Sequence, residues 1–89
     1  KGMALDLAKY NIRVNSVCPN LVLTPRTKKY FADKKYNRYV KENTPINKVV
    51  TVSDVATAIT FLASESSSMI TGASIIIDGG WTAKWKRFY

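Results

Sequence analysis

The sequence has no histidine and one cysteine, Cys18, among its 89 residues. The absence of histidine excludes the serine and cysteine triads that use it as a base, and most zinc sites. A single cysteine allows neither an intrachain disulfide nor a thiolate cluster, so we expect no metal. This cysteine usage favours a reducing, intracellular compartment, and we predict a cytoplasmic location.

Acidic residues and long hydrophobic runs are also scarce. No apolar run approaches the roughly 18 residues of a membrane span, so we expect no membrane partner. Fourteen Lys and Arg against six Asp and Glu give a net charge of +8, which raises nucleic-acid binding as a hypothesis. The basic residues gather in a tail, Lys84, Lys86 and Arg87, and in a central cluster, Arg26, Lys28, Lys29, Lys34, Lys35, Arg38 and Lys41. This basic cluster could attract an anionic substrate or form a solvated helix face.

The first half of the sequence predicts a helix followed by a strand. Apolar residues recur at helical spacing in residues 1–9. Asn11 tolerates the left-handed conformation that often follows a helix. Residues 12–18 alternate and are rich in β-branched side chains, which predicts a strand that Pro19 ends. Because the sequence opens inside an amphipathic pattern, we expect it to be a piece of a longer chain.

The second half predicts helical segments and a second strand. Residues 26–43 indicate one or two short helices, and Thr51 with Asp54 is a helix N-cap signature. An apolar stripe at helical spacing follows the cap: Val55, Ile59 and Leu62. Residues 73–77, bounded by glycines, predict a buried parallel strand. Two strands joined through a helix form a right-handed βαβ unit.

Three motifs follow one another along the sequence. They are Asn11-Ile12-Arg13-Val14-Asn15-Ser16-Val17-Cys18-Pro19, then Asp54-Val55-Ala56 with Phe61-Leu62-Ala63-Ser64-Glu65, then Ile70-Thr71-Gly72 with Ile77-Asp78-Gly79-Gly80. In their order and spacing they resemble the short-chain dehydrogenase/reductase family. The resemblance implies the α/β fold class, namely the C-terminal βαβ portion of a Rossmann-like, doubly wound parallel sheet. It implies that residues 1–89 are the C-terminal part of one such domain.

The resemblance also implies which parts of the enzyme lie elsewhere. The family's catalytic Ser and its Tyr-x-x-x-Lys pair are expected upstream of Lys1, as is the glycine-rich turn that binds the cofactor pyrophosphate. No catalytic residue is therefore assigned within the chain. Tyr30 and Lys34 have the same spacing, which would place both on one helical face. We interpret this pair as chance, because it falls in the variable substrate region.

Residues 19–24 resemble the family loop that holds the nicotinamide. In the family, backbone groups near the position of Val22 bind the carboxamide, and the hydroxyl at the position of Thr24 bonds the cofactor. The resemblance thus implies four cofactor-binding residues: Pro19, Asn20, Val22 and Thr24. Asn20 replaces the usual glycine. Asparagine tolerates positive φ, but its side chain could crowd the cofactor.

Residues 21–50 resemble the family's substrate loop with its lid helices. The residues expected to face substrate are Leu21, Pro25, Tyr30 and Phe31. The resemblance implies an NAD(P)-dependent oxidoreductase that transfers a hydride between NAD or NADP and a carbonyl or alcohol. Patterns at this end of the family include 3-oxoacyl carrier-protein reductases and sugar dehydrogenases. The 89-residue chain alone is expected to be inactive.

An alternative to the oxidoreductase is a non-catalytic interaction or binding module with the basic cluster as its contact surface. A dehydrogenase lid explains the tyrosines beside those charges, so we expect no nucleic-acid partner. A homo-oligomer, dimer or tetramer, is expected, and four tail aromatics pack on either their own or a neighbouring subunit: Trp81, Trp85, Phe88 and Tyr89. Because the strands would leave an exposed edge, the 89 residues are predicted not to form a stable monomer alone.

Overall fold

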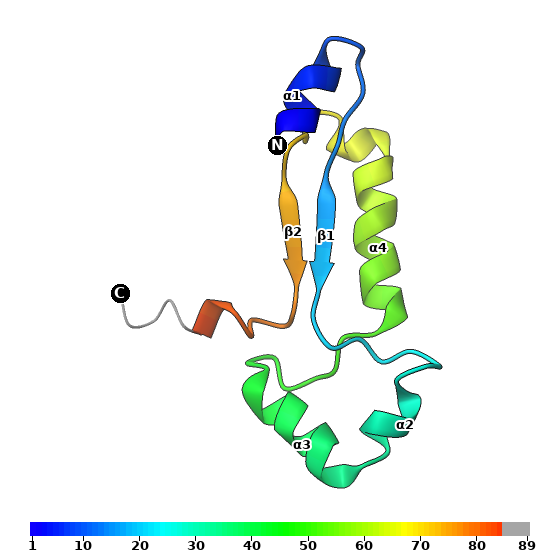
Figure 1. Ribbon diagram of the computed structural model, residues 1–89, viewed down its shortest axis with the longest axis vertical. Helices are drawn as coiled ribbons and strands as arrows, with labels where there is room; N and C mark the ends of the chain where they lie inside the picture. Colours follow the sequence, from blue (N-terminus) through cyan, green and yellow to red (C-terminus); the bar gives the residue numbers. More distant parts are fainter. Residues whose placement is uncertain (85–89) are drawn as a thin grey trace.

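The computed structural model describes residues 1–84, so the predictions for Trp85, Lys86, Arg87, Phe88 and Tyr89 lie outside the described part. Its elements are, in chain order, α1 (Gly2–Ala8), β1 (Ser16–Pro19), α2 (Lys28–Phe31), α3 (Lys34–Asn43), α4 (Val52–Ala63), a 3₁₀ turn (Glu65–Ser67) and β2 (Ser74–Ile77) (Figure 1). The predicted order of elements is confirmed. The segment between β1 and α4, here called the central excursion (residues 21–50), contains two short helices, α2 and α3.

The two strands form a parallel pair in which Ser16 lies beside Ser74 and Pro19 beside Ile77. Helix α4 runs alongside them and connects the excursion back to β2, which confirms the βαβ unit (Figure 1). Its cap is as predicted, because the Thr51 hydroxyl accepts from the Asp54 N–H while the Asp54 carboxylate accepts from the Thr51 N–H. This capping box satisfies donors that a helix start otherwise leaves unpaired.

The first strand is shorter than predicted and includes the proline that was expected to end it. Ser16 and Asn20 donate their N–H groups to carbonyls of the β2 segment at 3.0 and 3.1 Å. Since donors alternate along a strand, the nitrogen of Pro19 points away from β2 and the ladder loses no bond there. Before the strand begins, the Val14 carbonyl accepts from the Gly72 N–H at 2.8 Å, and Arg13 and Asn15 are held by their side chains, as described below.

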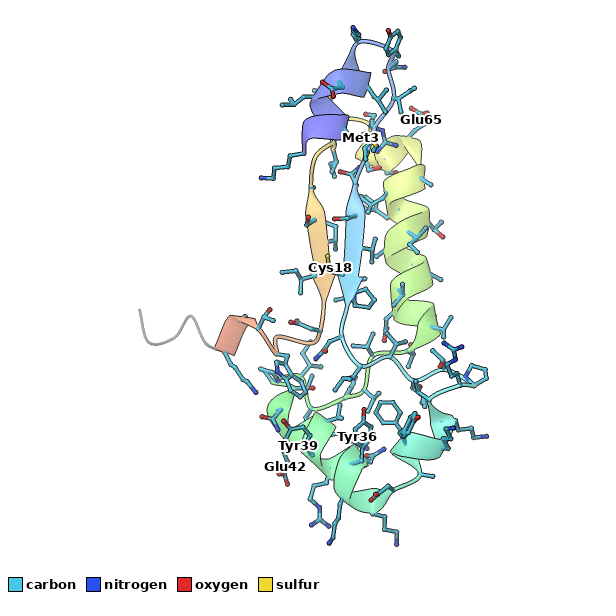
Figure 2. The ribbon with its side chains drawn as sticks, in the orientation of Figure 1. Met3, Cys18, Tyr36, Tyr39, Glu42 and Glu65 are labelled. Atoms are coloured by element: carbon cyan, nitrogen blue, oxygen red, sulfur yellow. The ribbon has the colours of Figure 1, made fainter. Side chains whose placement is uncertain are left out.

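The prediction that β2 is buried on both faces is wrong for this chain. Helix α4 covers one face of the sheet, where Val17, Ile75 and Ile77 are half-buried. The other face is exposed, and Ile76 on it keeps 57% of its surface accessible. Cys18 lies on β1, beside Ile76 in the register (Figure 2).

The predicted stripe on α4 is confirmed in part. Val55 and Leu62 are half-buried against the sheet, but Ile59 keeps 51% of its surface exposed. The stripe is therefore wider than the two strands can cover. Within residues 1–84, no helix is long and apolar enough to cross a membrane.

The molecule is more open than its size requires. Its accessible surface is 7054 Å² and its radius of gyration is 15.9 Å. A compact monomer of this mass has roughly 5,200 Å² of surface, and a domain of this length has a radius of about 12 Å. Among the described residues, the buried apolar side chains are Ala4, Phe31 and Val40. Much of the apolar surface is therefore left uncovered.

Candidate cofactor and substrate loop

The candidate site begins where β1 ends. Ligands of open parallel sheets bind at the carboxyl ends of the strands, and the loop Leu21–Thr24 starts at that edge (Figure 1). The Asn20 N–H donates to the Ile77 carbonyl at 3.1 Å, which fixes the first residue of the turn against β2. Within residues 1–84 positive φ angles among non-glycine residues occur at Asn11 and Asn47. Asn20 therefore has no positive φ, and the turn does not need a glycine at this position.

Two backbone donors in this loop have no protein partner. Among residues 1–84, neither the N–H of Leu21 nor that of Val22 donates to a protein acceptor. Leu23, the next residue, donates to the Val50 carbonyl at 2.8 Å. Unpaired backbone donors that are turned away from the sheet ladder can bind a carbonyl oxygen of a ligand. These two groups are therefore candidates to hold a ligand.

A pair of threonines closes the loop on itself. The Thr27 hydroxyl donates to the Val22 carbonyl at 2.7 Å and accepts from the Thr24 N–H at 2.8 Å. The Thr24 hydroxyl accepts from the Thr27 N–H at 3.1 Å. Because the single proton of the Thr27 hydroxyl goes to the Val22 carbonyl, the Thr24 hydroxyl is the donor in the longer, 3.2 Å contact between the two hydroxyls. Thr27 was not recognised from the sequence, because its role depends on the turn bringing it back to Val22.

The loop also packs against α4. Leu23 pairs with Thr51 in an isolated parallel bridge just before α4 begins. A hollow of about 290 Å³ lies between the loop and this helix, and it is lined by Pro19, Val22, Thr24, Val52, Val55, Ala56 and Ile59. Three of the four predicted cofactor residues therefore meet at one hollow. Asn20 is half-buried beside them, at the start of the turn.

The predicted substrate-loop residues divide into two groups. Leu21 and Pro25 are exposed in the loop, and Tyr30 is 52% exposed on α2. Phe31 is 8% exposed and meets the Tyr36 ring edge-on, with centroids 5.1 Å apart. Tyr36 lies between α2 and α3 (Figure 2). Phe31 therefore forms part of the small core that joins α2 and α3.

Tyr30 and Lys34 do not share one helical face, which agrees with the interpretation of their spacing as chance. Helix α2 ends at Phe31, and Asp33 has an extended ψ of 117° and caps a new helix, α3. The Asp33 carboxylate accepts from the Lys35 N–H at 2.9 Å. Because the helix is interrupted between them, the pair lacks the geometry of a Tyr-x-x-x-Lys site.

Three of the seven residues of the basic cluster lie on the outer face of α3. Val40 is buried and Tyr36 and Asn43 are half-buried, which defines the inner face of this helix. Lys34, Arg38 and Lys41 follow at i, i+4 and i+7 on the opposite side, and all three are exposed. The arrangement is that of a solvated helix face.

The turn after β2 is built around a buried carboxylate. Asp78 is 6% exposed and accepts from the Gly80 N–H at 2.9 Å, the Thr82 N–H at 2.9 Å and the Thr82 hydroxyl at 2.7 Å. Burial alone would raise the pKa of Asp78, but these hydrogen bonds from Thr82 and Gly80 outweigh it and hold the pKa below its usual value. Gly79 and Gly80 both have positive φ, 62° and 95°. The Asp-Gly-Gly motif is therefore a turn whose shape is fixed by one charge.

Residues of all three family motifs meet at the opposite end of the sheet. The Arg13 guanidinium donates to the Ser67 hydroxyl at 3.0 Å and to the Ser64 and Ile70 carbonyls at 3.2 and 3.3 Å. Asn15 donates to the Ile70 carbonyl at 2.9 Å and accepts from the Ala73 N–H at 3.0 Å. These residues hold the end of α4 and the start of both strands together. The motifs were recognised in the sequence, but this contact between them was not predicted.

No cluster of metal-ligating side chains occurs in the part of the chain that the structure describes. The site therefore consists of backbone groups, hydroxyls and an amide around an apolar hollow. These groups suit a neutral, planar amide such as the nicotinamide carboxamide better than a cation.

Comparison with known proteins identifies close relatives. The family model described as Enoyl-(Acyl carrier protein) reductase matches residues 1–82. A tropinone reductase homolog of Arabidopsis thaliana is 40% identical over 90% of this chain and 30% of its own length. Carbonyl reductase [NADPH] 2 of Sus scrofa is 41% identical over 93% of this chain and 34% of its own. The structure of 4-hydroxyisoleucine dehydrogenase complexed with NADH superposes with a TM-score of 0.87, at 38% identity, over 92% of this chain and 34% of that one.

A parallel βαβ unit with its loop at the carboxyl end of the first strand defines an α/β protein of the Rossmann-like class. The chain belongs to the short-chain dehydrogenase/reductase family. It spans about a third of the length of the curated relatives that it matches.

Proposed function

We propose that the chain is the C-terminal part of an NAD(P)-dependent oxidoreductase that transfers a hydride between a nicotinamide and a carbonyl or alcohol substrate. The pair of free N–H donors on Leu21 and Val22, at the carboxyl end of β1, carries the proposal. Family membership supports it, since relatives are named as a carbonyl reductase that uses NADPH and as a hydroxyisoleucine dehydrogenase complexed with NADH. NAD or NADP is the proposed cofactor.

Each loop residue then has a defined task. Val22 and Leu21 would hold the carboxamide oxygen through their N–H groups, which fixes the face that the nicotinamide turns to the substrate. Thr24 would donate its hydroxyl to the cofactor, while Pro19 and Asn20 set the turn. The bound dinucleotide supplies the hydride. The groups that move the proton, a Ser and a Tyr-x-x-x-Lys pair, are proposed to lie upstream of Lys1.

The uncovered surface supports a longer chain in which residues 1–89 form the C-terminal part of the domain. The sheet face that bears Ile76 is exposed, and β1 has an open edge opposite β2. Further strands on that edge would satisfy it. Val52, Ile59 and Phe61 of α4 are also exposed, which fits a dimer or tetramer of identical chains.

A substrate loop over residues 21–50 fits the same arrangement. It leaves β1, passes through α2 and α3 and returns at Thr51 beside Leu23 (Figure 1). Leu21, Pro25 and Tyr30 are the exposed side chains proposed to meet the substrate. The alternative of a binding module that uses the basic cluster has no comparable support, because Lys34, Arg38 and Lys41 form a solvated face.

The test compares two substitutions of one residue in the full-length protein that contains this chain. Val22→Pro removes the N–H donor, whereas Val22→Ala keeps it and serves as the control. We expect Val22→Pro to weaken binding of NADH or NADPH by about tenfold or more, in line with a lost hydrogen bond to a ligand, with Val22→Ala within about threefold of wild type. Fluorescence titration measures the affinity, and circular dichroism checks that both variants fold.

Two outcomes would contradict the proposal. Equal loss of affinity in both variants would show that the side chain, not the N–H, matters at this position. An intact mass of 10.0 kDa for the natural polypeptide would mean that no upstream catalytic groups exist. In that case a binding module would replace the oxidoreductase.

A further inference from the structure

The lid helices have few connections to the rest of the molecule. Within residues 1–84, α2 and α3 pack against each other, and neither packs against a strand or α4. Both ends of the excursion return to one place, where Leu23 meets Val50 and Thr51. A segment tied at its two ends alone would pivot about that point, because nothing would fix its far side.

The turn after β2 supplies a connection that reaches α3 itself. The Trp81 ring meets the Tyr39 ring edge-on, with centroids 6.0 Å apart and planes at 71°. Tyr39 and Glu42 lie at the end of α3 near this turn (Figure 2). Such an aromatic pair contributes beyond the area it buries.

Lys84 completes the connection at the last residue of α3. Its Nζ donates to the Asn43 carbonyl at 3.0 Å and to the Asn43 Oδ1 at 2.9 Å. It also lies 4.6 Å from the centre of the Trp81 ring. A cation at a helix C-terminus stabilises the carbonyls left unpaired there. Trp81 and Lys84 therefore act together on one end of one helix.

Two glycines let the turn approach this closely. The Ile46 N–H donates to the Gly79 carbonyl at 3.1 Å. A methyl group on Gly79 would meet the Thr44 side chain, and one on Gly80 would lie 3.1 Å from Pro45. The turn and the residues just after α3 are thus in direct contact, and Asp78 holds the shape of the turn from within.

We propose that Trp81 and Lys84 are positioning residues that hold α3, and with it the α2 helix packed on it, in a fixed place as the substrate lid. This proposal rests on the proposed function for its effect on substrate, but not for the contact itself. A substrate would then be positioned against a lid that the turn after β2 keeps in place.

Hydrogen exchange in the full-length protein tests the contact without reference to activity. We expect α3 amides to exchange about three- to tenfold faster in Trp81→Ala and Lys84→Met, as loss of one aromatic or charged contact implies. Exchange in α4 should stay at the wild-type rate. Trp81→Phe and Lys84→Arg should restore most of the protection, and Met69→Ala, on an exposed side chain far along the chain, should change nothing in α3.

Kinetics then test the effect on the lid. We expect the KM for substrate to rise by about three- to tenfold in Trp81→Ala and Lys84→Met while kcat stays within about twofold. The reason is that a less firmly held α3 weakens substrate binding but does not change the reacting groups. Unchanged exchange in α3 would overturn the proposal, and so would faster exchange spread equally over α4 and both strands. If no turnover exists in the wild type, the proposed function fails, whereas the exchange result still decides the contact.

Discussion

The Arg13 guanidinium donates to the Ser67 hydroxyl at 3.0 Å, although the two residues are 54 positions apart. Ser67 is almost fully buried, and its hydroxyl donates to the Leu62 and Ser64 carbonyls. Arg13 thus lies at the C-terminal end of α4, where a cation is favoured by the helix dipole. One charged side chain fastens the helix between the two strands to the segment that enters the first strand.

Replacing Arg13 by Met should remove this fastening. We expect Arg13→Met to lower the free energy of unfolding of the full-length protein by about 1–3 kcal/mol, because three hydrogen bonds from a charged donor are lost and the Ser67 hydroxyl loses the group that donates to it. Urea denaturation measures the change. Arg38→Met is the matched control, since Arg38 is exposed on the outer face of α3. Equal effects of the two variants would rule out a specific role for Arg13.

Glycine at position 79 should be required for the turn after β2. Gly79→Ala places a side chain in the left-handed region, at φ 62°, and against Thr44. We expect a loss of about 1–3 kcal/mol in the free energy of unfolding, from backbone strain together with the clash. Gly2→Ala is the control, because a methyl group at Gly2 meets nothing within 4 Å on α1. This control should be neutral or stabilising by up to about 1 kcal/mol.

Asp78 should make stability depend on pH in the acid range. Its hydrogen bonds hold the pKa in the folded protein below the usual value of 3.8. The unfolded chain therefore binds a proton first, so the stabilisation is complete above about pH 5 and is lost as pH falls through the folded-state pKa. We expect Asp78→Asn to flatten the fall in unfolding free energy between about pH 5 and pH 3.

The asparagine variant should also be less stable at neutral pH, by about 1–3 kcal/mol, because an amide accepts fewer of the three donors. Urea denaturation over the pH range measures both effects. Asp6→Asn removes an exposed carboxylate that accepts no hydrogen bond within residues 1–84, so it controls for the loss of a charge. This account would be contradicted if the unfolding free energy of Asp78→Asn fell with decreasing pH as steeply as that of the wild type.

Local signals in the sequence were sufficient wherever the structure is decided locally. The capping box at Thr51 and Asp54 and the left-handed Asn11, with φ 60°, were both predictable, because each depends on neighbours within a few residues. The order of strand, helix and strand followed from hydrophobic periodicity in the same way. The family motifs placed the cofactor loop at the end of β1, where the structure brings Pro19, Val22 and Thr24 to one hollow.

What the sequence could not show depends on contacts between distant residues. The start of β1 at Ser16 was missed because the Asn15 side chain, and not its backbone, accepts the hydrogen bond from the Ala73 N–H just before the strand. The burial of β2 was overestimated, since an apolar run is equally consistent with a strand that another part of a protein covers. Phe31 could not be separated from Tyr30 by type, because the meeting of α2 with α3 alone decides which ring is buried.

Pro19 has a consequence for any strand that would run along the open edge of β1. The nitrogen of Pro19 points to that edge and carries no hydrogen, so a third strand would lose one bond of its ladder there, while the Pro19 carbonyl would still accept one. Pairing along this edge is therefore weakest at the last residue of β1. Beyond it, where Asn20 begins the loop, a third backbone is the least constrained to follow the first.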